Sequence, residues 1–108
     1  MRNDLEEAVL TDLGRCKEFT ELSEIVACVE VCEHFMENLK EFAKDEYMDP
    51  SILFSPATTK IRKEPLGVAL IMGSWNFPYF VSLKPLATAI ATGNCVMLKP
   101  SELGPCSA

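Results

Sequence analysis

Two short polar segments, each following an apolar run, contain the residues best suited to chemistry. The first is the turn Gly73 to Pro78, in which Asn76 has a side-chain amide that can donate hydrogen bonds. The second is the segment 99–102, where Lys99 and Glu102 stand three residues apart. Such a pair can bind the hydroxyls of a sugar, because the carboxylate accepts from them and the ammonium donates to them. Taken alone, Asn76 is more simply explained as a residue that satisfies the turn.

The residues around these segments predict a strand, a helix and a second strand. Residues 66–72 form an apolar run without charge, which is typical of a strand buried on both faces. Apolar residues over 81–91 indicate a helix, and Gly93-Asn94 is expected to end it. Residues 95–98 form the second apolar run. Twenty-two residues separate Met72 from Cys95, too many for a hairpin, so we expect a βαβ unit with both polar segments beyond the carboxyl ends of parallel strands.

Four motifs in this region, taken in their order and spacing, resemble the aldehyde dehydrogenase superfamily. They are Glu-Pro-Leu-Gly-Val at 64–68, Trp-Asn-Phe-Pro at 75–78, Ala-x-Ala-x-Gly-Asn at 89–94 and Leu-Lys-Pro-Ser-Glu at 98–102. Asp-Leu-Gly-Arg at 12–15 and Ser-Glu-Ile at 23–25 look like the N-terminal helices of the same family. The phrase 74–78 looks most similar to the class three, fatty-aldehyde-type branch. Enzymes of this family run to several hundred residues, so the chain is expected to be an N-terminal fragment.

The resemblance implies an enzyme that oxidises an aldehyde to a carboxylic acid with NAD or NADP, through a cysteine thiohemiacetal and a thioester. In the family, the residue matched by Asn76 donates a hydrogen bond to the oxyanion of the thiohemiacetal. The residues matched by Lys99 and Glu102 hold the adenosine ribose of the cofactor. The nicotinamide side would be lined by the backbone of Ile71, Met72, Gly73, Ser74 and Trp75.

The charge of Glu102 disfavours a 2′-phosphate, so NAD is the first expectation, although class three relatives often accept NADP. The family's nucleophilic cysteine and its general-base glutamate lie in later motifs that this chain lacks. Cys95 and Cys106 are not expected to replace that nucleophile, so the chain alone is expected to be inactive. The alternative is a truncated, non-catalytic product that acts as a binding or regulatory piece. An independent nucleotide-binding module is disfavoured, because two strands leave an unfinished sheet.

The N-terminal half predicts two helices. Asn3 is a plausible N-cap for the first, which would run to Leu13 and end at Gly14, with Arg15 just beyond, where a cation favours the helix end. Apolar residues at three- and four-residue steps predict a second, amphipathic helix of roughly 25 residues that reaches Phe42. Its polar face would contain Glu24, Glu30, Glu33, Glu37 and Glu41.

The expected fold is therefore α/β, with N-terminal helices followed by the first βαβ unit of an incomplete Rossmann-like cofactor domain. We divide the chain into a helical segment (1–48), a linker with an exposed edge strand near 60–63 (49–64), and the start of an NAD(P)-binding domain (65–108). The two prolines in the linker, Pro50 and Pro56, disfavour regular structure there.

Composition and charge exclude several classes of partner. Residues 1–49 hold fourteen acidic against five basic side chains, which disfavours nucleic acid. No apolar run reaches the ~18 residues of a membrane span, so this segment is expected to make no membrane contact. Five cysteines without a Cys-x-x-Cys pair are typical of a reducing, cytoplasmic compartment. Some members of the family carry a membrane anchor at the far C-terminus, so the resemblance leaves an anchor outside this segment open. Cys28, Cys32 and His34 do not share one helix face, so no metal is expected. The parent enzyme is expected to be a homodimer.

Overall fold

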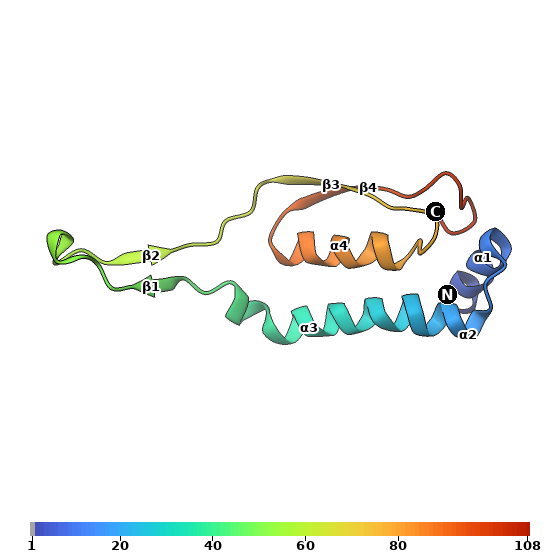
Figure 1. Cartoon of the computed structure of the whole chain (residues 1–108), viewed down its shortest axis with the longest axis horizontal. Helices are drawn as coiled ribbons and strands as arrows, with labels where there is room; N and C mark the ends of the chain where they lie inside the picture. The colour runs from blue at the N-terminus through green and yellow to red at the C-terminus, as the bar shows by residue number, and fades with distance from the viewer. Residues whose placement is uncertain (1) are drawn as a thin grey trace.

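The computed structural model describes residues 2–108 and shows an elongated chain that measures 64 × 24 × 18 Å along its principal axes. Figure 1 shows a helical layer below and a strand layer above, with a hairpin arm that projects from one end. The elements are α1 (Arg2–Leu13), α2 (Lys17–Thr20), the π-helical turn η1 (Glu21–Val26), α3 (Ala27–Phe42), β1 (Glu46–Met48), the 3-10 turn η2 (Ile52–Phe54), β2 (Thr59–Ile61), β3 (Val68–Met72), α4 (Phe80–Ala91) and β4 (Cys95–Lys99).

The predicted βαβ unit is confirmed: β3 and β4 pair in parallel, from Val68 opposite Cys95 to Met72 opposite Lys99, with α4 between them in sequence. The expected end of α4 is also confirmed. Gly93 has a φ of +84°, and its N–H donates to the carbonyl of Ile90 while the N–H of Asn94 donates to Ala89. These two bonds form a Schellman motif, which only a residue tolerant of positive φ allows without strain.

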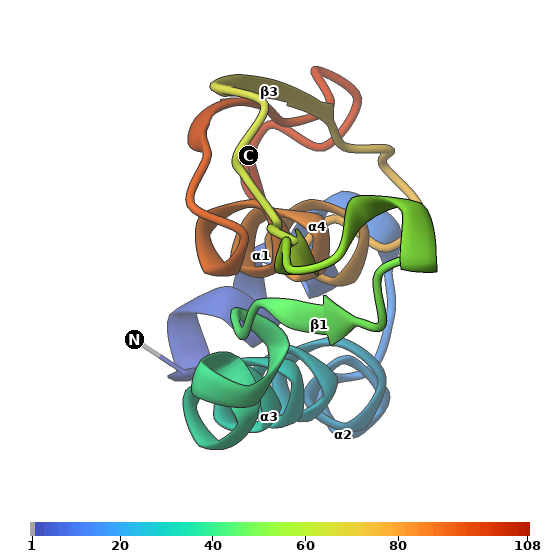
Figure 2. The same cartoon turned by 90° about the vertical axis from the view of Figure 1, so that its left-hand side faces the viewer.

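The expectation that residues 66–72 are buried on both faces is wrong for the described chain. Val68, Leu70 and Met72 are 67%, 61% and 72% exposed, whereas the alternating residues Ala69 and Ile71 are half-buried. Contacts with α4 and the alternation along the strand place the half-buried residues on the helix side of the sheet. A parallel sheet is buried on both faces only when helices cover both. Within residues 2–108, only one face is covered (Figure 2).

The first helix begins earlier than predicted. Asn3 lies inside α1, which starts at Arg2, so Asn3 is not an N-cap. The predicted stop is confirmed, because Gly14 has a φ of +65° and its N–H donates to the carbonyl of Leu10 at 2.9 Å. At the same end of the molecule, Asp12 accepts hydrogen bonds from the backbone N–H groups of Cys106 and Ser107, which ties α1 to residues near the C-terminus.

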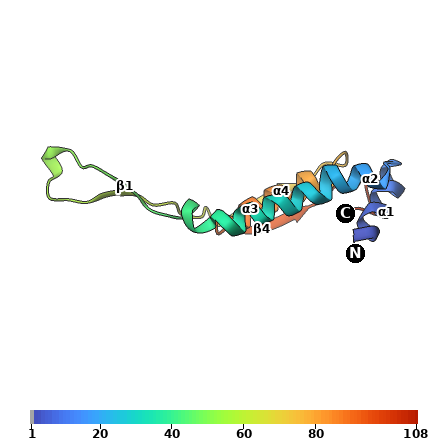
Figure 3. The same cartoon turned by 90° about the horizontal axis from the view of Figure 1, so that it is seen from below.

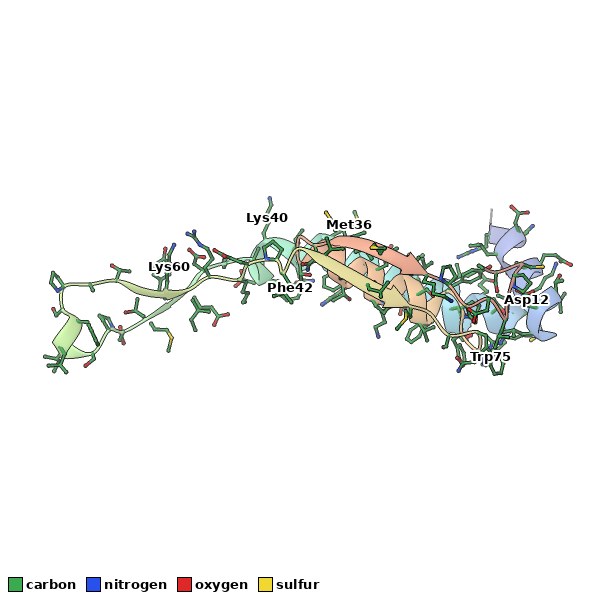
Figure 4. The ribbon with its side chains drawn as sticks, turned by 90° about the horizontal axis from the view of Figure 1, so that it is seen from above. Asp12, Met36, Lys40, Phe42, Lys60 and Trp75 are labelled. Atoms are coloured by element: carbon green, nitrogen blue, oxygen red, sulfur yellow. The ribbon has the colours of Figure 1, made fainter. Side chains whose placement is uncertain are left out.

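The long amphipathic helix is present as one continuous helical path over α2, η1 and α3, and α3 packs against α4. Figure 4 shows the side chains of Met36 and Phe42 along α3, between the arm and the α1 end of the molecule. The π-helical turn at 21–26 was not predicted. Such turns insert an extra residue and are frequent at functional sites. Here the turn contains Glu24, whose assignment to the polar face is wrong, because its side chain is completely buried.

The segment between α3 and β3 forms a hairpin arm. The exposed strand expected near 60–63 is present as β2, and it pairs antiparallel with β1, a strand that the sequence did not predict. Asp45 joins the two sides of the arm at its base, since it accepts from Lys60 at 2.5 Å and from Arg62 at 3.3 Å. Figures 1 and 3 show the arm extending beyond the layered part of the chain, with η2 at its tip. None of the helices within residues 2–108 has the length and apolar character needed to cross a membrane.

Candidate active and cofactor site

The two polar segments meet at one edge of the sheet. The register places Met72 opposite Lys99, and the N–H of Gly73 donates to the carbonyl of Lys99 at 2.9 Å, one residue beyond the end of β3. In Figure 1 the segments that follow β3 and β4 both lie at the end of the sheet nearest α1. The structure therefore brings the turn that contains Asn76 beside the segment that contains Lys99 and Glu102, at the carboxyl edge where parallel sheets bind ligands.

The side-chain amide of Asn76 is held from one side only. The hydroxyl of Ser74 donates to Oδ1 of Asn76 at 2.6 Å. No hydrogen-bond partner for Nδ2 is present among residues 2–108, and the side chain is exposed. A hydroxyl that donates to Oδ1 selects the amide orientation in which the two N–H groups of Nδ2 point away from Ser74. The arrangement leaves a hydrogen-bond donor available at the strand edge.

Arg15 contacts the same turn from the junction between α1 and α2. Its guanidinium donates to the backbone carbonyl oxygen of Asn76 and lies over the ring of Phe77, 4.4 Å from the ring centroid. The same guanidinium forms an ion pair with Glu24. Sequence reasoning missed this contact, since it assigned Arg15 to the end of α1. The signal available was the Asp-Leu-Gly-Arg motif itself, which a helix stop alone did not explain.

The buried carboxylate of Glu24 lies at the N-terminus of α4. Its Oε2 accepts from the backbone N–H groups of Tyr79 at 2.8 Å and Phe80 at 3.2 Å, while Oε1 faces Arg15. A carboxylate is favoured there because the first N–H groups of a helix lack partners and carry partial positive charge. Burial, together with the nearby charge of Glu24, raises the pKa of the Tyr79 phenol, whose hydroxyl donates to the carbonyl of Leu5.

A side chain at position 73 would collide with Ser82. A Cβ atom at this position would lie 2.1 Å from the Oγ of Ser82, a buried residue on α4. The φ of Gly73 is not positive, so the backbone itself would accept alanine. The absence of a side chain therefore lets the end of β3 lie directly against α4.

We expect Gly73→Ala to lower the free energy of unfolding by about 1–3 kcal/mol, as other overpacked sites do. Ser82→Ala should restore most of this loss, because it removes the Oγ atom and leaves a Cβ contact of 3.4 Å. Urea unfolding of the two single variants and the double variant measures the coupling. Additive effects in the double variant would show that the clash with Ser82 is not the cause.

Lys99 and Glu102 form an exposed ion pair. The Nζ of Lys99 lies 2.5 Å from Oε2 of Glu102 and 3.2 Å from the carbonyl of Pro100. The hydrogen bond from Lys99 is the main reason that the pKa of Glu102 is lower than usual, so the carboxylate stays ionised. The remaining N–H donor of Lys99 and the charged carboxylate of Glu102, both open to solvent at a strand end, suit the adjacent hydroxyls of a ribose. The donor set therefore fits the sugar of a nucleotide cofactor.

The remaining residues predicted to line the cofactor lie at the end of β3 and the start of the turn that follows it. Ile71 and Met72 end β3, and Met72 is exposed. Trp75 is half exposed at the start of the turn, and Figure 4 shows it at the same end of the molecule as Asp12 and opposite the arm that contains Lys60. These positions are compatible with the predicted contacts, which stay predictions.

Two of the cysteines, Cys28 and Cys106, lie in environments that disfavour the thiolate. Cys95 and Cys106 are exposed free thiols. A hydrogen bond to Asp12, together with its negative charge, raises the pKa of Cys106, and burial raises that of Cys28. A raised pKa disfavours the thiolate, which is the nucleophilic form. Over residues 2–108, the structure contains no cluster of three or more side chains that could hold a metal ion.

The parallel unit β3–α4–β4, with hydrogen-bonding side chains beyond the ends of both strands, is typical of the α/β class, whose open parallel sheets bind ligands at the carboxyl edge. A sequence model described as "Aldehyde dehydrogenase family" matches residues 1–108. The chain belongs to the aldehyde dehydrogenase family.

Individual relatives agree with the class three resemblance. The chain is 41% identical to aldehyde dehydrogenase family 3 member B3 of Mus musculus over 99 residues. This aligned region covers 92% of this chain and 21% of that protein. It is 39% identical over 100 residues to the dimeric NADP-preferring aldehyde dehydrogenase of Canis lupus familiaris, covering 93% of this chain and 22% of that one. The substrate-bound state of Staphylococcus aureus AldH superposes with a TM-score of 0.94 and 35% identity, over 97% of this chain and 23% of that chain.

These comparisons confirm the predicted superfamily, its class three branch and the α/β fold. The chain spans about a fifth of the length of the curated relatives it matches.

Proposed function

We propose that this chain is part of an NAD(P)-dependent dehydrogenase that oxidises an aldehyde to a carboxylic acid through a cysteine thiohemiacetal and a thioester. The observation that carries the proposal is the register of β3 and β4. In this register, the turn of Asn76 and the Lys99–Glu102 pair lie at the same carboxyl edge. The amide of Asn76 suits an oxyanion, and the Lys99–Glu102 pair suits a sugar. The division into a helical segment (1–48), a linker (49–64) and the start of a cofactor domain (65–108) is part of this proposal.

Asn76 would stabilise the oxyanion that forms when a thiolate adds to the aldehyde carbonyl. The free N–H groups of Nδ2 supply the donor, and Ser74 keeps Oδ1 turned away from the anion. One such donor in a preorganised site typically lowers the barrier by ~3 kcal/mol. The nucleophilic cysteine and the general base of this reaction would not come from residues 1–108.

The cofactor would lie along the carboxyl edge of the sheet. Lys99 and Glu102 would hold its adenosine ribose, and the backbone from Ile71 to Trp75 would line its nicotinamide. When bound, the nicotinamide accepts the hydride from the substrate. The ionised carboxylate of Glu102 disfavours a 2′-phosphate by charge, which supports NAD as the first choice. The name of the canine relative, NADP-preferring, supports NADP as a second cofactor.

The proposed partners follow the family. The substrate is an aldehyde, and the whole enzyme is proposed to be a homodimer; the name of the canine relative, which calls that protein dimeric, supports this. The acidic N-terminal half supports the absence of nucleic acid as a partner. Five free cysteines support a cytoplasmic location.

Purified enzyme that carries this segment should reduce NAD in the presence of a fatty aldehyde, and the absorbance of the reduced nicotinamide measures the rate. We expect a higher kcat/KM with NAD than with NADP. The isolated 108-residue chain should show no turnover and no heat of NAD binding in a calorimetric titration, because it supplies only one side of the site. A stable native product of this length, without a longer form, would instead favour the non-catalytic binding or regulatory role.

A further inference from the structure

Arg15 connects the start of the helical layer to the turn that contains Asn76. Its side chain is 16% exposed, and its guanidinium has partners in three directions. It donates to the backbone carbonyl of Asn76 and pairs with the carboxylate of Glu24, and its Cζ lies over the rings of Phe77 and Phe19, at 4.4 and 5.7 Å from their centroids. The carbonyl, the carboxylate and the two rings together restrict where the guanidinium can lie.

Glu24 holds the other end of the same turn. The wholly buried carboxylate uses Oε2 for the backbone N–H groups of Tyr79 and Phe80 and Oε1 for Arg15. The backbone from 76 to 80 is therefore held at both ends, at the carbonyl of Asn76 by Arg15 and at the first amides of α4 by Glu24. Arg15 and Asn76 are 61 positions apart in sequence, so this is a tertiary contact and not part of the turn itself.

We propose that Arg15 and Glu24 form a positioning pair that fixes the backbone of Asn76 and thereby the direction of its amide. The inference rests on the proposed oxyanion role of Asn76 and extends it to two residues outside the turn. Both act through Asn76 and are not catalytic residues. A misplacement of about 1 Å in a catalytic group can reduce the rate on the order of 100-fold, so a pair that prevents it has a measurable effect on kcat.

A purely structural role for the pair predicts a different result. A pair that only stabilises the fold would change stability, cofactor KM and kcat independently of Asn76. A positioning pair affects kcat only while the amide of Asn76 is present. The two roles are therefore separated by a double-mutant cycle between Arg15 and Asn76.

The test uses the whole dehydrogenase that carries this segment. Arg15→Gln should lower kcat by about 10- to 100-fold, with cofactor KM within about twofold of wild type. Arg15→Lys, which keeps a cationic donor, should stay within about threefold of the wild-type kcat. In the Asn76→Ala background, Arg15→Gln should reduce kcat no further. Arg62→Gln is the matched control, because Arg62 also pairs with a carboxylate, Asp45, but lies at the base of the arm.

A wild-type kcat for Arg15→Gln beside an impaired Asn76→Ala would overturn the inference and leave the proposed function intact. An equal loss of kcat in both backgrounds would also overturn it, since the pair would then act independently of the amide. A wild-type kcat for Asn76→Ala would remove the oxyanion role and the inference together. If Arg15→Gln does not fold, the kcat of Glu24→Gln, measured with and without Asn76→Ala, tests the inference in its place. Glu24→Gln keeps one oxygen for the amides of Tyr79 and Phe80, presents an amide to Arg15, and should show the same dependence on Asn76.

Discussion

Replacing Asn76 by alanine should lower kcat by about 100-fold or more in the enzyme that carries this segment, with little change in cofactor KM. The physical reason is that the amide donates to a charge that exists fully only in the transition state, so its loss raises the barrier without weakening ground-state binding. Steady-state kinetics with a fatty aldehyde and NAD measures both parameters. The expected effect is large because two contacts hold Asn76 in place. Ser74 donates to its side-chain oxygen, and Arg15 donates to its backbone carbonyl.

The matched control for this prediction is Asn38→Ala. Asn38 is a half-buried residue of α3, and its amide bonds only within its own helix, to the carbonyl and the ring nitrogen of His34. The substitution removes the same chemical group far from the sheet edge, so kcat should stay at the wild-type value. Unimpaired turnover of Asn76→Ala would assign that residue to the turn alone, which is the simpler explanation that the residues suggested by themselves.

Replacing Lys99 by alanine should raise the cofactor KM by about tenfold or more, while kcat at saturating cofactor changes little. Lys99 would donate to the ribose, far from the reacting carbon, so its contribution is the same in the ground state and the transition state. A hydrogen bond from a charged donor is worth more than a neutral one even at an exposed site. Asn76→Ala is therefore expected to change mainly kcat, and Lys99→Ala mainly the cofactor KM.

Lys40→Ala provides the control for Lys99, because Lys40 is an exposed lysine of α3 that Figure 4 shows beside Phe42 near the base of the arm, away from Trp75. In a second experiment, Glu102→Gln should raise the kcat/KM for NADP relative to that for NAD, since it removes the charge that would repel a 2′-phosphate. A normal cofactor KM for Lys99→Ala would exclude this residue from the cofactor site.

Local sequence patterns were sufficient for the βαβ unit. The apolar runs at 66–72 and 95–98, and the Gly93-Asn94 pair between helix and strand, predicted its strands and the helix end, because each depends on neighbouring residues alone. The family resemblance supplied the roles of Asn76, Lys99 and Glu102, and those roles are untested. Exposure was predicted less well: Leu70 and Cys95 are exposed since nothing within residues 2–108 covers the outer face of the sheet.

The contacts around Asn76 show the limit of sequence reasoning. Glu24 was placed on the polar face of an ideal helix, and Arg15 was assigned to the end of α1. Both assignments used helical periodicity and local charge, which describe a residue relative to its own element. The actual partners of Glu24 lie 55 and 56 residues further along the chain, at Tyr79 and Phe80.

The sequence by itself determined the main helices, the βαβ unit with its parallel connection, and the family, but not β1 or the π-helical turn. Only the tertiary structure decided that a buried carboxylate caps α4, that a guanidinium reaches Asn76, and that Gly73 lies against Ser82. The reason is that periodicity and turn chemistry act over a few residues, whereas a buried ion pair forms only where packing brings distant segments together. The position of Asn76, the candidate oxyanion donor, depends both on the local turn and on its contact with the distant Arg15.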